Sequence, residues 1–142
     1  MKKCIIGYTQ GTYDMFHIGH LNLLNAAKKK CDYLIVGVNS DELVMQYKNK
    51  VPVISEQNRQ AIVENIKAVD ECIIVSTLDK IAAYERFKFD FIFIGDDWKG
   101  NERWRQTEIA MERLGAKVIY LPHTDGISST LLRPKENNKV AE

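Results

Sequence analysis

Two histidines, His17 and His20, stand three residues apart in the segment Gly11–His20, where an apolar run gives way to an amphipathic one. Residues at i and i+3 lie on the same face of a helix, so both imidazoles are expected to face one ligand. The helix N-terminus beside them offers unpaired N–H groups and a partial positive charge, which favour an anion such as phosphate. Gly11 and Gly19 are expected to let a ligand approach the backbone. The segment predicts a phosphate-handling turn with two groups that donate or accept protons.

A metal site is the main alternative for the two histidines. Zinc needs at least one more His, Cys or carboxylate ligand in position. The only other histidine is His123, and the cysteines are scattered at Cys4, Cys31 and Cys72. We therefore expect no metal bound by side chains, and the phosphate interpretation is favoured.

Composition limits the class of protein. The chain has 142 residues, 45% hydrophobic and 27% charged, and a net charge of +1, which is typical of one soluble globular domain. This balance gives no support to a nucleic-acid or membrane partner, since either would favour a basic face. An odd number of dispersed cysteines suits free thiols in a reducing compartment, and no run approaches the roughly 20 apolar residues of a membrane span. We expect a cytoplasmic protein.

Short apolar runs alternate with longer amphipathic segments. The expected strands are Lys3–Tyr8, Tyr33–Val38, Glu71–Val75, Phe91–Ile94 and Lys117–Leu121. The expected helices are Ile18–Lys30, Asp41–Gln46, Glu56–Lys67, Leu78–Phe87, Asn101–Leu114 and a short one that begins near Ser128. This order predicts a single α/β domain over residues 1–133, with a mostly parallel sheet covered on both faces, and a polar tail over residues 134–142.

Polar segments follow four of the expected strands, where open α/β sheets bind ligands. They are Thr9–His20, Asn39–Ser40, Gly95–Gly100 and Pro122–Thr130. In the last one, Gly126 precedes the hydroxyl run Ser128, Ser129 and Thr130, which suits a second anion cradle. An ordinary helix cap at Ser128 is the alternative. Because both cradles fall on one rim, a site that spans several phosphates is the better interpretation.

Two other polar segments each admit two interpretations. Lys48 and Lys50 are suited to closing over a charged substrate and neutralising a transition state, or they belong to a solvated loop. Asp97 and its neighbour Asp96 are suited to orienting a substrate hydroxyl or magnesium, while Trp98 is equally suited to packing at the sheet edge. No nucleophile elbow and no P-loop pattern is present in the sequence.

Taken in order, these segments resemble the cytidylyltransferase family of the HxGH nucleotidyltransferases. Gly11–His20 is similar to the family signature GTFDxxHxGH, and Pro122–Thr130 is similar to its RTxGISTT segment. Gly95–Gly100 is similar to the GDDWxG stretch of the members that use glycerol 3-phosphate, and Val69–Glu71 also resembles those members. The resemblance covers nearly the whole chain.

The resemblance implies a Rossmann-like doubly wound fold, a homodimer, and CMP transfer from CTP to glycerol 3-phosphate with Mg²⁺. The products would be CDP-glycerol, for wall or capsule polymers, and pyrophosphate. Mg²⁺ is expected to bind through the nucleotide phosphates. Catalytic roles are implied for His17, His20 and Lys48. Nucleotide contacts are implied for Thr12, Tyr13, His17, Ile18, Gly19, His20, Lys50, His123, Thr124, Asp125, Gly126, Ile127, Ser128, Ser129 and Thr130. Acceptor contacts are implied for Lys48, Lys80, Asp14, Asp97 and Trp98.

Two positions depart from the family pattern. His123 and Lys67 stand where many members have arginine, whose planar fork grips phosphate as His and Lys do not. A weaker triphosphate clamp is one expectation, and recruitment of Arg103, Arg105 or Arg133 is another. Three alternative functions stay open: transfer to another small phospho-alcohol, adenylyl transfer from ATP, and a catalytically silent nucleotide sensor.

Overall fold

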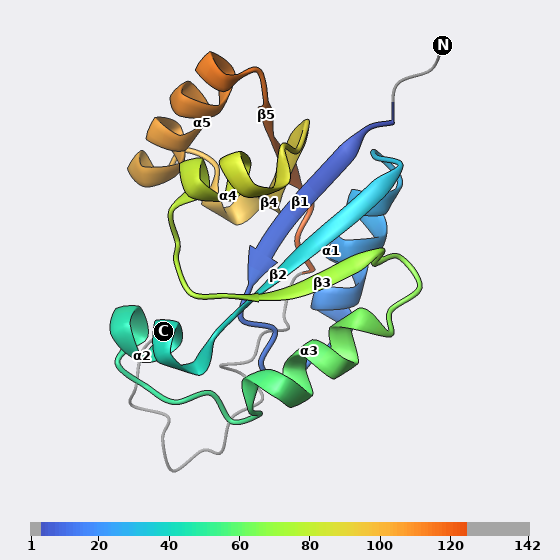
Figure 1. Cartoon of the computed structure of the whole chain (residues 1–142), viewed down its shortest axis with the longest axis vertical. Helices are drawn as coiled ribbons and strands as arrows, with labels where there is room; N and C mark the ends of the chain where they lie inside the picture. Colours follow the sequence, from blue (N-terminus) through green and yellow to red (C-terminus); the bar gives the residue numbers. More distant parts are fainter. Residues whose placement is uncertain (1–3, 125–142) are drawn as a thin grey trace.

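The computed structural model describes residues 4–124 of the chain. Within them, five parallel strands form one sheet in the order β3-β2-β1-β4-β5 (Figure 1). The strands are β1 (Ile6–Gly11), β2 (Tyr33–Asn39), β3 (Glu71–Val75), β4 (Phe91–Gly95) and β5 (Lys117–Leu121). The bounds predicted for β3 and β5 are confirmed. β1 was expected to begin at Lys3, and it instead runs through Gly11, so that the signature begins inside the strand.

Helices cover both faces of this sheet (Figure 1). The elements are α1 (Ile18–Lys28), α2 (Asp41–Lys48), α3 (Glu56–Glu64), α4 (Lys80–Phe87), the short 3₁₀ helix η1 (Asp96–Trp98) and α5 (Glu102–Leu114). Side chains of α1 and α3 enter one buried cluster, and those of α4 and α5 enter the other. The prediction of a Rossmann-like, doubly wound α/β domain is therefore confirmed. Over residues 4–124, no helix has the length and apolar character of a membrane span.

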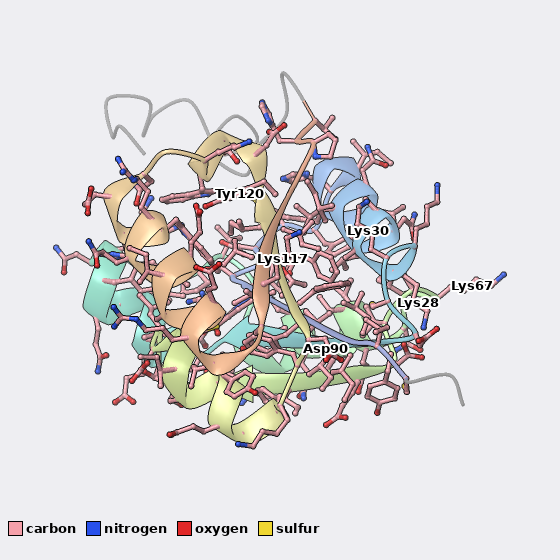
Figure 2. The ribbon with its side chains drawn as sticks, turned by 90° about the horizontal axis from the view of Figure 1, so that it is seen from above. Lys28, Lys30, Lys67, Asp90, Lys117 and Tyr120 are labelled. Atoms are coloured by element: carbon pink, nitrogen blue, oxygen red, sulfur yellow. The ribbon has the colours of Figure 1, made fainter. Side chains whose placement is uncertain are left out.

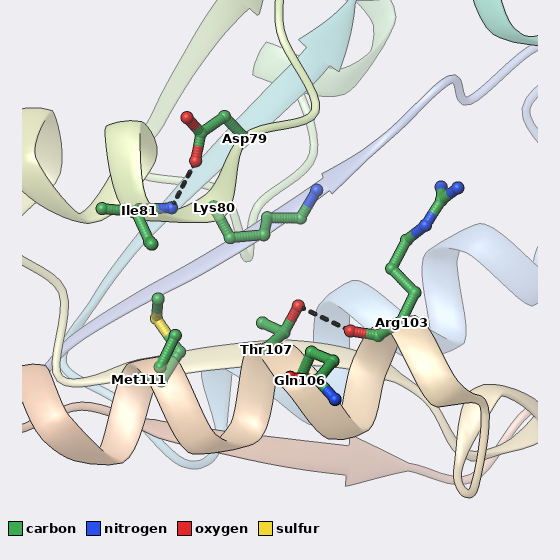
Figure 3. A pocket seen from close by; sticks show the side chains of 8 residues that line it. Asp79, Lys80, Ile81, Arg103, Gln106, Thr107 and Met111 are labelled. Atoms are coloured by element: carbon green, nitrogen blue, oxygen red, sulfur yellow. Dashed lines mark hydrogen bonds between the residues drawn. The ribbon is translucent and has the colours of Figure 1, made fainter.

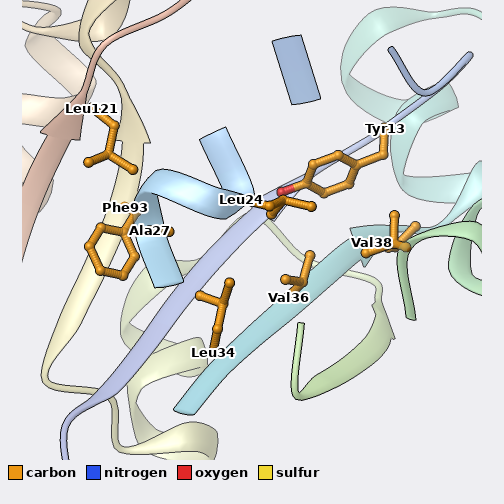
Figure 4. Packing of buried hydrophobic residues seen from close by; sticks show 9 residues of the cluster. Tyr13, Leu24, Ala27, Leu34, Val36, Val38, Phe93 and Leu121 are labelled. Carbon is orange, nitrogen blue, oxygen red and sulfur yellow. The ribbon is translucent and has the colours of Figure 1, made fainter. Parts of the chain in front are cut away.

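The two clusters divide each central strand between them. Leu34, Val36 and Val38 of β2 pack toward α1 and α3, as Figure 4 shows, whereas Ile35 packs toward α4 and α5. Successive strand residues point to opposite faces, so a sheet covered on both sides needs an unbroken apolar run. This requirement explains why the strands could be found from the sequence without any alternation of polar residues.

Local signals set the helix ends. Ser55 caps α3 through its side chain, and Gly115 ends α5 in the left-handed conformation at φ 91°, as both residue types predicted. α3 stops at Glu64 and not at the expected Lys67, because the next turns use tighter i→i+3 bonds such as Ile66 N–H to Val63 O. The helix expected near Ser128, the boundary at residue 133 and the tail lie outside the described residues.

Lysines and carboxylates share the edge at the amino ends of the strands, where Asp32, Asp70 and Asp90 accept backbone N–H groups. Figure 2 shows Lys28, Lys30 and Lys67 on one side of the molecule. Lys28 closes α1, where its ammonium lies 2.5 Å from the Asp70 carboxylate, as expected for a solvated helix end. Lys67 lies between α3 and the start of β3, at the edge opposite the carboxyl ends of the strands. It therefore cannot join a phosphate clamp at those ends within one chain.

All three cysteines are free thiols, as the sequence suggested. Burial raises the pKa of Cys31 and brings that of Cys72 to about 12, so both are poor nucleophiles. Cys4 is exposed and not buried, because it precedes β1, which begins later than predicted.

The sheet opens between β1 and β4. β1 pairs with β2 from Ile6 through Gly11, but it pairs with β4 only at Gly7–Phe91 and Tyr8–Ile92. The Thr9 hydroxyl still donates to the Phe93 carbonyl at 3.0 Å, just beyond the last pair. The strand order reverses direction here, and open α/β sheets bind ligands at such a switch point. The fold thus places a switch point, where a ligand-binding crevice is expected, at the carboxyl ends of β1 and β4.

Candidate active site

The turn from β1 into α1 is held in an uncommon backbone conformation. Tyr13 and Met15 have φ of 57° and 51°, in the left-handed region that non-glycine residues rarely occupy. The Tyr13 ring is buried in the core, and a Cβ atom at Gly11 would lie 3.1 Å from it. Gly11 therefore leaves room for the Tyr13 ring, and its expected role in ligand approach stays a prediction. Any nucleotide contact by Tyr13 is left to its backbone.

The two histidines cap α1. The His17 Nδ1 atom accepts the Gly19 N–H at 3.1 Å, and the His20 Nδ1 atom accepts the His17 N–H at 3.1 Å. This arrangement is a capping box in which imidazoles take the places of the usual hydroxyl and carboxylate. An acceptor Nδ1 fixes the neutral tautomer that carries its proton on Nε2. Both rings thus keep an Nε2–H donor for a ligand at this helix end.

The surroundings keep these rings neutral and in place. They stack with centroids 3.8 Å apart, and the Tyr13 ring meets His20 edge-on at 5.4 Å. Burial, and next the neighbouring His17, lower the pKa of His20 to about 4. Burial also lowers the pKa of His17. A neutral imidazole is a hydrogen-bond donor that needs no proton from solution, so the geometry suits donation to phosphate and not base catalysis.

A buried arginine that sequence reasoning missed joins the loops of this site. Arg59 of α3 is 1% exposed. Its guanidinium donates to the carbonyls of Thr12 and Asn39, both at 2.7 Å, and lies 2.5 Å from an Asp41 carboxylate oxygen. Its Nε donates to the Ile54 carbonyl at 2.8 Å. One side chain therefore fixes the ends of β1 and β2, the start of α2 and the loop before α3.

Asp14 holds the loop that carries Lys50. Its two carboxylate oxygens accept the N–H groups of Val53 and Ile54 at 2.8 and 2.9 Å, and its side chain is buried. These bonds let Asp14 position the loop, and the acceptor contact that the resemblance implies for it stays a prediction. Lys48 is the last residue of α2 and is exposed. Lys48 and Lys50 therefore flank the start of the loop that Asp14 holds through its bonds to Val53 and Ile54.

A polar network ties α2 to the signature turn. The Tyr47 hydroxyl lies 3.0 Å from the Thr12 hydroxyl and accepts the Asn39 side-chain amide at 3.1 Å. Gln10 donates to the Asn39 side-chain oxygen at 2.9 Å and extends the network along β1. Thr12, expected at the nucleotide, thus sits beside the residue that precedes Lys48. Neither Tyr47 nor Gln10 stood out in the sequence.

The far side of the crevice is formed after β4 and β5. The His123 Nδ1 atom lies 2.5 Å from an Asp96 carboxylate oxygen, which lowers the pKa of Asp96. Ligand atoms of Asp96, Asp97 and His123 all lie within 4.8 Å of one another, and all three residues are exposed. Trp98 is 46% exposed, so part of its surface is open to a ligand and both interpretations stay predictions.

The segment after β5 reaches the helix that carries the histidines. The Asn22 side chain of α1 donates to the Thr124 hydroxyl at 2.9 Å. This bond joins two segments that the sequence had linked only through their expected places on one rim. The second cradle, Asp125–Thr130, lies outside the described residues, so its contacts with this site stay a prediction.

Lys80 stands apart from the histidines, at the start of α4 on the other face of the sheet. Its ammonium donates to the Leu78 carbonyl at 2.9 Å and lies 5.7 Å from the centre of the Trp104 ring. Burial, and next the nearby Arg103, lower the pKa of Lys80 to about 8. A partly desolvated ammonium is well suited to an anionic ligand, because a bound anion replaces the hydration it has lost.

Comparison with known proteins agrees with this geometry. Residues 8–135 match the cytidylyltransferase-like family. A glycerol-3-phosphate cytidylyltransferase from Bacillus spizizenii is 42% identical over 134 residues, which are 94% of this chain and 95% of the relative. A FAD synthase from Ferroglobus placidus is 36% identical over 119 residues, 84% of this chain and 75% of the relative. The lipopolysaccharide core biosynthesis protein of Thermoplasma volcanium has a TM-score of 0.75 at 28% identity, covering 87% of this chain and 100% of that one.

The doubly wound sheet and the histidine-capped crevice define a Rossmann-like nucleotidyltransferase. Within that class, the chain belongs to the cytidylyltransferase-like family.

The buried arginine yields a first prediction. Arg59→Met should lower the free energy of unfolding by on the order of 3 kcal/mol, because it leaves Asp41 and three carbonyls without their donor. Urea unfolding followed by circular dichroism measures this difference. Arg113→Met, at an exposed position on α5, is the control and should change stability little. Equal stabilities for the two variants would contradict the role given to Arg59.

The imidazoles yield a second prediction. In an NMR titration, His20 should protonate near pH 4 and His17 below its usual 6.5, both from the Nε2–H tautomer. The unfolded chain binds protons on these side chains from about pH 6.5, so folding stability should fall as the pH drops from there toward 4. His20→Ala assigns the signal. A His20 pKa at or above 6.5 would exclude the capping geometry.

Proposed function

We propose that this protein transfers CMP from CTP to glycerol 3-phosphate and releases CDP-glycerol and pyrophosphate. The observation that carries this proposal is the pair of Nε2–H donors fixed by the capping box at the mouth of the β1–β4 crevice. The similarity to glycerol-3-phosphate cytidylyltransferase over nearly the whole chain supports the choice of substrates. The neutral histidines suit a reaction whose nucleophile is already an anion.

The chemistry needs positioning and charge stabilisation more than acid–base catalysis. A phosphate oxygen of the acceptor attacks the α-phosphorus of CTP in line, the new P–O bond forms, and the bond to the β-phosphate breaks as pyrophosphate leaves. Two anions must therefore be held together while charge builds on the α-phosphate. We assign His17 and His20 to donate hydrogen bonds to that phosphate, with the free N–H groups of α1 in support.

We assign the remaining residues by the side of the crevice on which they stand. Lys48 and Lys50 approach from the end of α2, where Tyr47 and Asp14 hold their segment against the signature turn. Lys50 is assigned to the nucleotide and Lys48 to the transferring phosphate. The acceptor is assigned to Lys80, Asp97 and Trp98. Ile18, Gly19, His123, Thr124 and the segment Asp125–Thr130 complete the proposed nucleotide contacts.

Magnesium enters this proposal with the nucleotide. Mg²⁺ prefers carboxylate and phosphate oxygens and keeps several waters, so it needs no cage made by the protein alone. The carboxylates of Asp96 and Asp97 at the crevice fit such an ion bound to phosphates, although Asp96 is already engaged by His123. When bound, the ion would neutralise charge on the departing pyrophosphate.

Three alternatives stay distinct from this proposal. Another small phospho-alcohol would use the same chemistry, and a silent nucleotide sensor would keep the pocket without turnover. The similarity to a FAD synthase gives some support to adenylyl transfer from ATP, because FAD contains an adenylyl group. We also propose a cytoplasmic enzyme, which the free thiols support, and a homodimer, as the family resemblance implied.

The test is pyrophosphate release with Mg²⁺, crossing CTP and ATP against glycerol 3-phosphate and other phospho-alcohols. We expect CTP with glycerol 3-phosphate to exceed every other pair. His17→Ala and His20→Ala should each lower kcat by roughly 100-fold, the scale of one lost oxyanion donor. The two variants also serve as controls, because pyrophosphate release by a contaminating enzyme would persist in both. A preference for ATP, or near-normal turnover in either variant, would overturn the assignment, and no release despite CTP binding would favour the sensor.

The histidine that replaces arginine yields a further prediction. His123→Arg should lower the KM for CTP, because an arginine beside Asp96 presents a planar fork to phosphate that imidazole lacks. Steady-state kinetics at saturating acceptor measure this change, with His123→Gln as the control that removes the imidazole. An unchanged or raised KM for CTP would show that the histidine at this position does not weaken the binding of the CTP phosphates.

A further inference from the structure

A pocket of about 390 Å³ lies between α4 and α5, on the sheet face opposite α1. Figure 3 shows the cationic heads of Lys80 and Arg103 at one end of it and Met111 at the other. Gln106 and Thr107 line its middle. Its walls therefore change from charged, through polar, to apolar along its length.

The charged end holds two cations close enough to repel each other. Arg103 is the second largest cause, after burial, of the low pKa of Lys80, whereas Asp79 acts in the opposite direction. The Asp79 carboxylate is already used as the cap of α4, where it accepts the N–H groups of Ile81 and Ala82. The Leu78 carbonyl takes only one of the three ammonium donors of Lys80. Asp79 also lines the pocket and offsets part of the repulsion between the two cations, and a bound anion would offset it further.

We propose that Arg103 is a specificity-determining residue that grips the phosphate of the acceptor together with Lys80, with the acceptor's alcohol tail directed along the α4–α5 pocket. This inference rests on the proposed function for the identity of the acceptor. It goes beyond that function by giving the acceptor phosphate a planar fork from α5 as well as the ammonium from α4.

The location favours the acceptor over the triphosphate, which was the other destination considered for Arg103. The histidines that receive the nucleotide phosphates cap α1 on one face of the sheet, and the pocket opens on the other. The switch point between β1 and β4 lies between these two sides, because the two strands form no ladder pair beyond Tyr8–Ile92. A phosphate at the charged end would thus meet the α-phosphate across the crevice, while Gln106 and Thr107 offer polar groups to a short polyol.

The test separates the KM for each substrate in pyrophosphate release. Arg103→Met should raise the KM for glycerol 3-phosphate roughly 10-fold or more, since one charge-assisted hydrogen bond is lost, and leave the KM for CTP unchanged. Arg103→Lys should recover part of the loss, because it keeps the charge without the fork. Arg113→Met, exposed on the same helix and outside the pocket, should change neither KM. A raised KM for CTP, or no change in either KM, would overturn the proposal.

A second readout needs no turnover and separates failure of this inference from failure of the proposed function. Inorganic phosphate titrated into the wild-type protein should shift the indole N–H signal of Trp104, against which Lys80 lies, and should do so more weakly in Arg103→Met. If no substrate pair reacts but this shift appears, the anion site stands and the reaction is reassigned. If CTP and glycerol 3-phosphate react but Arg103→Met gives an unchanged shift and unchanged kinetics, the role of Arg103 is rejected alone.

Discussion

The site depends first on the buried guanidinium of Arg59. Its N–H groups reach the carbonyls that end β1 and β2, the loop before α3 and the carboxylate of Asp41. These segments come from three separate parts of the chain: the turn after β1, the junction of β2 with α2, and the loop before α3. A buried charge is costly unless its donors are satisfied, so the arginine is stable only when all these loops take one arrangement. The same requirement makes the rim of the crevice rigid before a substrate arrives.

His17 and His20 have both a structural role, as the cap of α1, and a proposed chemical role, as hydrogen-bond donors. Each Nδ1 atom satisfies a backbone N–H group that the first turn of α1 would otherwise leave without a partner. This bond sets the ring orientation and the tautomer, and the Tyr13 ring supports it from the core. The residues that stabilise the helix end are thus the ones that we propose donate Nε2–H groups to a phosphate.

Most of the fold could be predicted from the sequence, because short apolar runs mark even the half-buried edge strands β3 and β5 to the residue. The strand that opens the site was displaced, since polar and glycine residues such as Gln10 and Gly11 continue β1 without an apolar signal. Spacing correctly placed His17 and His20 on one helix end. Arg59 was missed because a lone arginine on a helix gives no sign of burial, which depends on carbonyls distant in the chain. The inward turn of Asp14 was missed for the same reason.

The opening between β1 and β4 divides the sheet into two parts, the strands β3, β2 and β1 and the strands β4 and β5. Strands β3, β2 and β1 are paired along their lengths, as are β4 and β5. The seam between β1 and β4 holds two residue pairs, the Thr9 bond, and two bonds between Ile6 and Asp90 at its amino end. Any molecule that contacts His20 on one side and Asp97 on the other fastens the seam. A substrate bound across this seam would hold the two parts of the sheet together. Part of its binding free energy would then stabilise the folded state.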